Sequence, residues 1–353
     1  MATQQYKHTR TRSPYFVQMA SSEAGVTCEL YIWTGDGLLD VPASPQYTLT
    51  KEVFDGAATF EVAELIRDYI TQNSTLTSGA VWWKADLNDG VASTSTYKEL
   101  ATEGYQTYES GLQHPSVNTI PETVALPVDT NGTFRVTTAT GANGVVPVIF
   151  NNTNSTNWTY TSYDYNNNVI TTSAVSLSEN HNGQFSYFTV NTNTQRVELD
   201  FNGATQTCYI DELRCSKYEP IRLLYVNKHG AKNYVHFHLK SVEEINTSSD
   251  TFKRSLVDYS GLTNGNNLHA VRKRITGSKQ SFTLNTDWVA EYYTQQIEEL
   301  LLSEYVWLVK TSGNPIPVNV STSKMTKKTH VNDKLINYTL EVETASEYIN
   351  TVR

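Results

Sequence analysis

The chain has 353 residues, of which 39% are hydrophobic and 18% charged, and its formal net charge is −9. This length predicts two or three domains with hydrophobic cores, and the acidic total argues against specific nucleic-acid binding. No stretch approaches the roughly 20 apolar residues that span a bilayer, and the N-terminus lacks the apolar core of a signal peptide. We therefore expect a protein folded in a cytosol, without a membrane partner, whose cysteines Cys28, Cys208 and Cys215 are reduced thiols.

The composition favours strands and turns, because tyrosine and threonine favour β structure and asparagine favours turns. We predict a mainly β protein: two small β-sandwich-like domains, followed by a β-sheet module with one packed α-helix. The expected domains are an N-terminal arm over 1–12, a β-sandwich with a short helix over 13–120, an Asn/Thr-rich β-sandwich or barrel over 121–215, and the β module over 216–353.

The first two domains show mostly short strand patterns. Strands are expected at 29–33, 46–50, 80–84, 133–137, 145–150, 184–189 and 196–201, separated by Asn- and Gly-rich loops. The stretch 61–70 differs, because Val62, Leu65, Ile66 and Tyr69 are spaced as on one face of a short helix.

The last module changes character. Strands are expected at 221–227 and 234–239, joined by a turn in which Gly230 suits a positive φ. A helix is predicted over 287–303, capped by Thr286 or Asp287, with an apolar face that includes Ile297 and Leu300. This face should pack on a sheet formed by strands at 305–309, 316–320 and 337–343.

A search for chemical motifs finds neither a phosphate-binding Gly-rich loop, nor a nucleophile elbow, nor a His-Glu-x-x-His helix. We therefore predict that the protein is not an enzyme, that it has no catalytic residue and that it needs no cofactor. His236 and His238 are two residues apart on a predicted strand and could share a metal if a third ligand joined them. The more ordinary interpretation is a pair of satisfied or solvated strand histidines, and the sequence leaves the metal question open.

Aromatic residues gather near polar loops in the second domain. Trp158, Tyr160, Tyr163 and Tyr165 could form a glycan-contact patch, because aromatic rings stack on sugar faces. Core or cross-strand aromatic pairs are the more common use of such residues.

Charge is spread unevenly along the chain. Residues 1–215 contain 10 Lys and Arg against 22 Asp and Glu, a net charge of −12, whereas residues 216–353 contain 17 against 14, a net charge of +3. Arg272, Lys273 and Arg274 form a basic cluster in the last module and are a candidate assembly surface that could pair with an acidic neighbouring subunit. Solvated strand ends are the alternative interpretation.

The segment from Cys215 to Ala231 resembles one that recurs in virion structural proteins of tailed bacteriophages, including marine and Bacteroidetes-infecting phages. Further similar stretches follow in the same order at 284–286, 302–307, 316–318 and 331–341, and near the N-terminus at 13–17 and 63–70. Residues 121–200 carry little of the resemblance. The strand and helix order of the last module is similar to that of tail-tube and distal-tail proteins.

This resemblance implies a structural component of a phage virion, assembled in the host cytoplasm. The expected role is that of a tail or tail-tip protein, distal-tail-like or baseplate-like, that assembles with copies of itself into a ring or tube and contacts other virion proteins. Two alternatives stay open. One is a receptor- or glycan-binding virion protein, with a host surface glycan as partner. The other is a head, collar or decoration protein.

Overall fold

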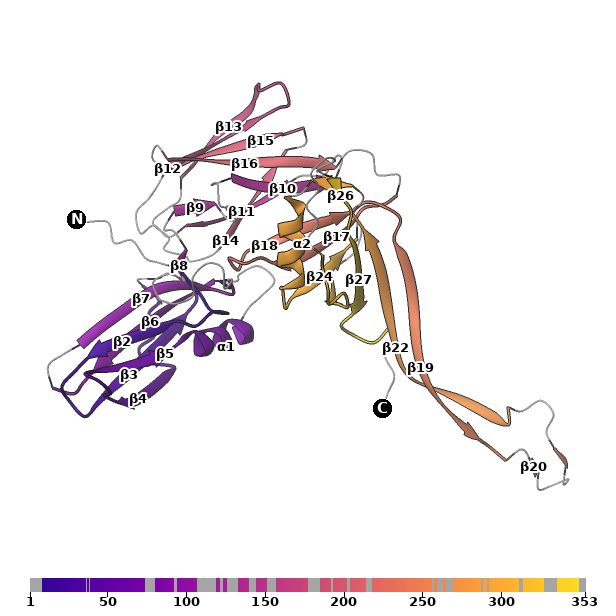
Figure 1. Ribbon diagram of the computed structural model, residues 1–353, viewed down its shortest axis with the longest axis horizontal. Coiled ribbons are helices and arrows are strands. Elements are labelled where there is room, and N and C mark those ends of the chain that lie inside the picture. Colours follow the sequence, from indigo (N-terminus) through magenta and orange to yellow (C-terminus); the bar gives the residue numbers. More distant parts are fainter. Residues whose placement is uncertain are drawn as a thin grey trace. The chain divides into compact units, whose positions relative to one another are not determined.

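The structure is a computed structural model that describes residues 8–35, 37, 39–73, 80–91, 94–106, 119–120, 123–125, 133–139, 144–150, 157–176, 185–191, 193–201, 204–213, 218–255, 257–258, 263–264, 269–286, 288–290, 292–310, 314–326 and 335–348. The fold is mainly β, as the sequence predicts (Figure 1). The chain forms two compact units. The first consists of Met1–Cys215 and Tyr225–Tyr234, and the second consists of Ser216–Leu224 and Val235–Arg353.

The first unit begins with a six-stranded sheet, and a strand pair and a helix lie over one of its faces. The sheet order is β4-β3-β6-β7-β1-β8, and β2 pairs with β5. Apolar side chains that alternate along β3 and β6 are buried together with Phe60 and Ile66, and this alternation explains the sandwich. The element bounds are β1 His8–Arg10, β2 Phe16–Ala20, β3 Gly25–Trp33, β4 Tyr47–Glu52, β5 Ala57–Glu61, α1 Ala63–Asn73, β6 Ala80–Asn88, β7 Thr94–Thr102 and β8 Thr119–Ile120.

The short helix predicted from the 61–70 pattern is confirmed as α1. Val62, Ile66 and Ile70 are fully or almost fully buried, and Leu65 and Tyr69 pack against the same core. Glu61 stands just before the helix and accepts a hydrogen bond from the backbone N–H of Ala63 at 2.9 Å. A carboxylate at this end satisfies a backbone N–H that the helix itself leaves without a partner.

A buried carboxylate ties the start of the chain to β7. Glu99 accepts hydrogen bonds from the hydroxyl of Thr9 at 2.6 Å and from that of Tyr15 at 2.7 Å. Tyr15 also meets the ring of Trp83 edge-on, with 5.6 Å between ring centres. Because both carboxylate oxygens have donors, we assign this network a structural role.

The remainder of the first unit contains a five-stranded sheet, β10-β16-β15-β12-β13, and a three-stranded sheet, β14-β11-β9. Leu199, Cys208 and Ile210 are buried on one face of the larger sheet. The strands predicted from Thr133, Val145, Gln184 and Arg196 onward are confirmed within two residues at each end. The element bounds are β9 Thr123–Ala125, β10 Thr133–Ala139, β11 Gly144–Phe150, β12 Asn157–Tyr163, β13 Val169–Ser176, β14 Phe185–Val190, β15 Arg196–Phe201 and β16 Ala204–Leu213.

The last part of the chain forms a seven-stranded sheet with one helix, as predicted. The order is β18-β17-β24-β25-β27-β22-β19, and shorter pairs form between β20 and β21 and between β23 and β26. The element bounds are β17 Ile221–Val226, β18 Lys232–Phe237, β19 Val242–Lys253, β20 Val257–Asp258, β21 Thr263–Asn264, β22 Val271–Asn285, β23 Val289–Ala290, α2 Tyr293–Leu301, β24 Val306–Val309, β25 Ile316–Val320, β26 Leu335–Ile336 and β27 Thr339–Thr344.

The helix is shorter than the predicted 287–303, and this prediction was wrong at its start. Val289 and Ala290 form β23, which pairs with Leu335 and Ile336 of β26, so helical structure begins only at Tyr293. The helix has no side-chain N-cap, and the expected cap by Thr286 is not formed: the Thr286 hydroxyl bonds to the backbone of Tyr338 instead. The expected cap by Asp287 lies outside the described residues.

The buried face of α2 agrees with the prediction at Ile297 and Leu300, which are at most 1% exposed. Tyr293 fastens the helix to β18, because its hydroxyl both accepts from the backbone N–H of His236 at 3.1 Å and donates to its carbonyl at 2.8 Å. The helix is therefore held on the sheet by its buried apolar face and by the two hydrogen bonds between Tyr293 and the backbone of His236.

The turn between β17 and β18 belongs to the first unit and contacts the end of β7. Gly230 has a φ of +86°, and a Cβ added there would lie 2.7 Å from the Cβ of Thr102 and 2.9 Å from the backbone nitrogen of Glu103. Asn227 shapes the turn by accepting hydrogen bonds from the backbone N–H groups of His229 and Ala231.

We expect Gly230→Ala to lower the free energy of unfolding by about 1–3 kcal/mol, because the new methyl group adds a backbone clash to the strain of a positive φ. Gly56→Ala is the matched control, since Gly56 has a φ of +78° but no atom within 4 Å of an added Cβ. Urea unfolding of both variants measures the difference. Equal losses at the two positions would show that the contact with β7 contributes nothing.

Candidate functional site

The most distinctive surface of the second unit is a long hairpin, formed by β19 and β22 over residues 242–285. β22 pairs with β27 only from Ser281 to Asn285, and Ser278 to Gln280 still contact residues 343–348, so from Val271 to Gly277 the one strand that pairs with it among the described residues is β19. The ribbon runs out beyond the rest of its sheet (Figure 1). Its outer part therefore has two free edges, with backbone N–H and C=O groups open to another chain.

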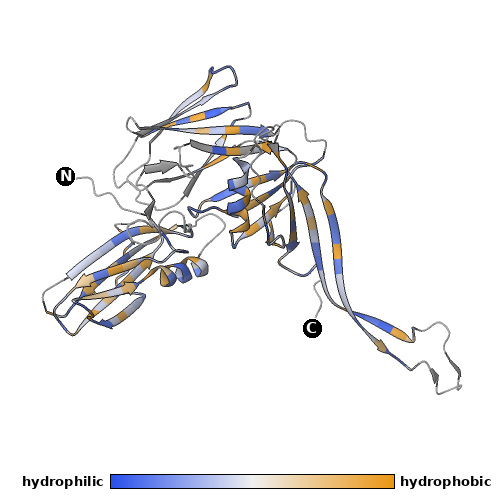
Figure 2. Cartoon of the chain, viewed as in Figure 1, coloured by the Kyte–Doolittle hydropathy of each residue, from blue (hydrophilic) through white to orange (hydrophobic). Residues whose placement is uncertain are grey.

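Side chains on the outer part of the long hairpin are exposed on both faces. Eleven of the twelve residues of β19 are exposed. Several of the exposed side chains are large and apolar, and polar residues stand between them along both strands (Figure 2): Ile245 (53% exposed), Phe252 (50%), Val271 (53%) and Ile275 (41%). An isolated two-stranded ribbon is at best marginally stable in water, and exposed apolar residues of this kind mark interaction surfaces.

The predicted basic cluster lies on the outer part of this hairpin. Arg272 and Arg274 stand opposite Phe252 and Asp250 and share one face, whereas Lys273 lies on the other face. No ion pair involves the three cations within the part of the chain that the structure describes. Residues 246–279 contain six Lys and Arg and two Asp, a net charge of +4. The hairpin thus offers cations and apolar groups on both faces, which suits an acidic protein surface with apolar residues of its own.

The four aromatic residues proposed as a glycan patch do not share one face. Tyr160 stands opposite Leu199, on the buried face of the five-stranded sheet, whereas the side chain of Trp158 lies outside the described residues. Tyr163 lies on the opposite, open face, and Tyr165 is exposed in the turn that follows. The sequence interpretation missed that residues 157–163 form a strand, and the alternation of that strand separates the aromatic rings.

The open face of the same sheet carries a row of alternating cations and aromatic rings. Arg135, Tyr209, Arg196 and Tyr163 stand directly opposite one another across β10, β16, β15 and β12. The guanidinium carbon of Arg135 lies 5.0 Å from the ring centre of Tyr209, and that of Arg196 lies 4.1 Å from the ring centre of Tyr163. Contacts of this length are cation–π interactions.

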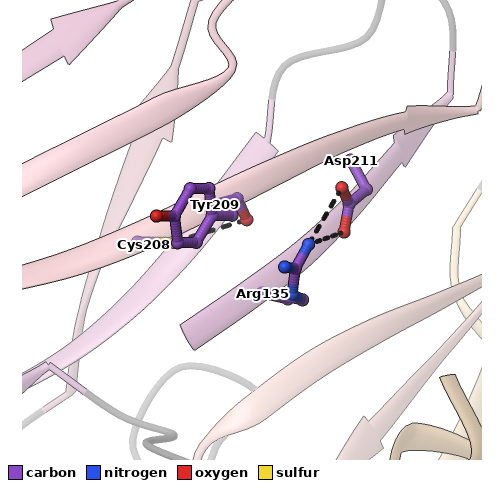
Figure 3. A network of polar contacts seen from close by, with 4 residues as sticks. All are labelled: Arg135, Cys208, Tyr209 and Asp211. Atoms are coloured by element: carbon purple, nitrogen blue, oxygen red, sulfur yellow. Dashed lines mark hydrogen bonds and ion pairs between the residues drawn. The ribbon is translucent and has the colours of Figure 1, made fainter. Parts of the chain in front are cut away.

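Carboxylates neutralise both arginines of this row. Asp211 lies 3.3 Å from a terminal nitrogen of Arg135 (Figure 3). Glu198 accepts hydrogen bonds from Nε of Arg196 at 3.0 Å and from the hydroxyl of Tyr163 at 2.9 Å, and the latter bond raises the pKa of Tyr163. The row is a pre-organised polar surface that can hydrogen-bond a polyhydroxylated ligand, although the same contacts also stabilise the sheet by themselves.

His236 and His238 are both buried. No group of three or more potential metal ligands occurs among the residues that the structure describes. Burial, together with the neighbouring Arg222 and His238, lowers the pKa of His236 to about 3. His236 is therefore neutral in the folded protein.

This burial predicts a loss of stability in acid. Below the ordinary histidine pKa of about 6.5, His236 binds a proton in the unfolded chain but not in the folded one. The free energy of unfolding therefore falls as the pH drops from about 6.5 towards 3. The contribution is at most about 1.4 kcal/mol per pH unit. His236→Gln should flatten the dependence of unfolding free energy on pH relative to the wild type, measured by urea titration at several pH values. Parallel slopes for the two proteins would contradict this prediction.

None of the described helices has the length and apolar character that crossing a membrane requires. Neither a protein-family model nor a curated protein sequence matches this chain. The geometry of its surfaces therefore carries the functional argument.

Proposed function

We propose that this protein is a structural component of a tailed bacteriophage virion that acts by self-assembly, as a tail or tail-tip protein of the distal-tail or baseplate type. It has no enzymatic role in this proposal. Its partners are copies of itself and other virion proteins, and it is assembled in the host cytoplasm. The resemblance of residues 215–353 to phage structural proteins supports the assignment to a phage virion. The exposed surface of the second unit supports self-assembly.

The observation that carries the proposal is the long hairpin. A ribbon with exposed apolar side chains on both faces and two free edges gains stability when another protein covers it. Its cations steer that partner, because the rest of the chain is acidic. A subunit that places such a hairpin on the next copy makes a head-to-tail contact, which closes into a ring or continues as a tube. A head, collar or decoration protein could use the same contact. The hairpin therefore supports self-assembly more directly than it supports a location in the tail.

A second candidate function is glycan binding by a virion protein. The observation that favours it is the open row of Arg135, Tyr209, Arg196 and Tyr163 with its two carboxylates, since sugar-binding surfaces combine aromatic rings with charged hydrogen-bonding groups. Arg135→Ala and Tyr209→Ala should then reduce retention of the protein on host surface polysaccharide.

The location of the chain in the particle tests the main proposal. Immunogold labelling of intact phage particles with an antibody against this protein should place the label at the tail or tail tip. Label on the head would transfer the proposal to the head, collar or decoration class. Labelling that is absent from purified particles, while infected cells contain the protein, would reject a virion role.

A further inference from the structure

A second exposed surface, in the first unit, has chemistry complementary to that of the long hairpin. It consists of three turns at one end of the first sandwich, over residues 21–24, 52–56 and 88–91, which we call the loop end. Hydrogen bonds join the turns: Ser21 N–H donates to the carbonyl of Gly56 at 3.1 Å, and its hydroxyl donates to the carboxylate of Asp89 at 3.1 Å. The backbone N–H of Val53 donates to the carbonyl of Ala24 at 3.1 Å.

The loop end is acidic and partly apolar. Its three turns contain Glu23, Glu52, Asp55 and Asp89 and no Lys or Arg. Glu23, Glu52 and Asp55 are exposed, and within the described residues none of these three forms an ion pair. Phe54 stands among them at 86% exposure, and Val91 is 70% exposed. A phenylalanine so exposed at the tip of a turn marks an interaction surface.

We infer that the long hairpin of one copy docks on the loop end of a second copy. This inference rests on the proposed self-assembly and names its two surfaces. The four acidic residues of the loop end match the net charge of +4 over residues 246–279. Phe54 and Val91 offer apolar area to Phe252, which shares one face of the hairpin with Arg272 and Arg274, so that face brings an apolar group and two cations to the contact.

The charges also decide between two geometries of assembly. Pairing of two long hairpins edge to edge would bring two clusters of net charge +4 together, and like charges across an interface are strongly unfavourable. Docking of hairpin on loop end brings opposite charges together. Two different surfaces then meet, so the contact either repeats head to tail from copy to copy or is made twice within a reciprocal pair.

Charge reversal on both sides of the contact tests the inference on the full chain. The donor variant is Arg272→Glu with Arg274→Glu, and the acceptor variant is Glu23→Lys with Glu52→Lys. Asp55 is left unchanged because its φ of +51° disfavours a longer side chain. The matched control is Lys240→Glu with Lys324→Glu, which changes the charge of the same unit by the same amount at exposed positions away from the outer hairpin.

We expect each of the donor and acceptor variants to weaken self-association at least about tenfold at low salt, with a smaller effect at high salt, because exposed charges are screened. The variant that carries all four substitutions should recover most of the wild-type association. The control should associate as the wild type does, and melting temperatures should stay within a few degrees, since all of the changed side chains are exposed. Sedimentation equilibrium at two salt concentrations gives these affinities.

Other outcomes separate the claims. If the wild-type chain does not associate at any concentration, the proposed self-assembly fails. If the donor variant is weakened but the acceptor variant is not, or if the combination recovers nothing, the chain assembles through the hairpin and the loop end is not its partner. If a mixture of wild type and donor variant associates more tightly than either alone, the hairpins pair with one another and the inference is overturned.

Discussion

Replacing residues 246–279 by an Asn-Gly turn is expected to give a folded chain that no longer self-associates. Ile245 and Gln280 stand opposite each other in the hairpin, so a two-residue turn can join them, and Asn-Gly suits the type I′ geometry of such a turn. The deletion removes the free edges, the basic cluster and three of the exposed apolar residues. It leaves the pairing of β22 with β27 intact.

Light scattering of the truncated chain during gel filtration measures the result, and circular dichroism shows whether the rest of the fold is kept. A second variant separates the apolar contribution from the charge: Phe252→Thr, Val271→Thr and Ile275→Thr keep the length and the cations of the hairpin. We expect it to weaken association without abolishing its salt dependence, since apolar burial supplies affinity and charges supply specificity and rate. If the truncated chain forms oligomers of the same size as the wild type does, the hairpin takes no part in self-association.

The largest expected effect on stability is that of Leu300→Ala in α2. Leu300 is 0% exposed, and removing a fully buried leucine side chain costs about 2–5 kcal/mol, because it loses buried apolar area and leaves a cavity. Ile297→Ala should cost a similar amount. Leu302→Ala is the matched control, since Leu302 follows the helix and is 44% exposed. Urea unfolding of the full chain, followed by circular dichroism, measures the three losses. If Leu300→Ala and Leu302→Ala cost the same, the helix is not held by its apolar face.

Sequence patterns predicted the parts of this fold in which one face is buried. The alternation in 196–201 and the helical spacing of Val62, Leu65, Ile66 and Tyr69 both come from a single core, and both predictions are confirmed as β15 and α1. The start of α2 was predicted wrongly because Val289 fits the helical spacing as well as it fits a strand. Its pairing with Ile336, 47 residues further along the chain, decides between the two, and local sequence carries no information about such a contact.

The long hairpin escaped prediction for a related reason. Hydrophobic periodicity in a sequence arises when one face of an element is buried and the other is exposed. β19 has no buried face, so its sequence shows no such alternation. Its threonines and other β-branched residues between Val242 and Phe252 were the available signal, because these residue types are enriched in strands. The basic cluster was visible in the sequence, but its place on an outlying ribbon was not.

For the aromatic residues of the second domain, the sequence suggested a shared surface that the structure does not form. Tyr160 and Tyr163 are close in sequence and suggest one patch, yet the alternation of side chains along the strand places them on opposite faces. The row on the open face combines residues from four strands, and Arg135 and Tyr209 are 74 positions apart. Only the register of the strands brings them together.

Self-assembly through the long hairpin is the central claim, and sedimentation velocity of the full-length chain tests it most directly. Over a roughly hundredfold range of protein concentration, the account predicts a shift from monomer to larger species at the higher concentrations, as mass action requires. The shift should be absent from the chain in which Asn-Gly replaces residues 246–279. A single monomeric species for the full-length chain at every concentration would contradict the account.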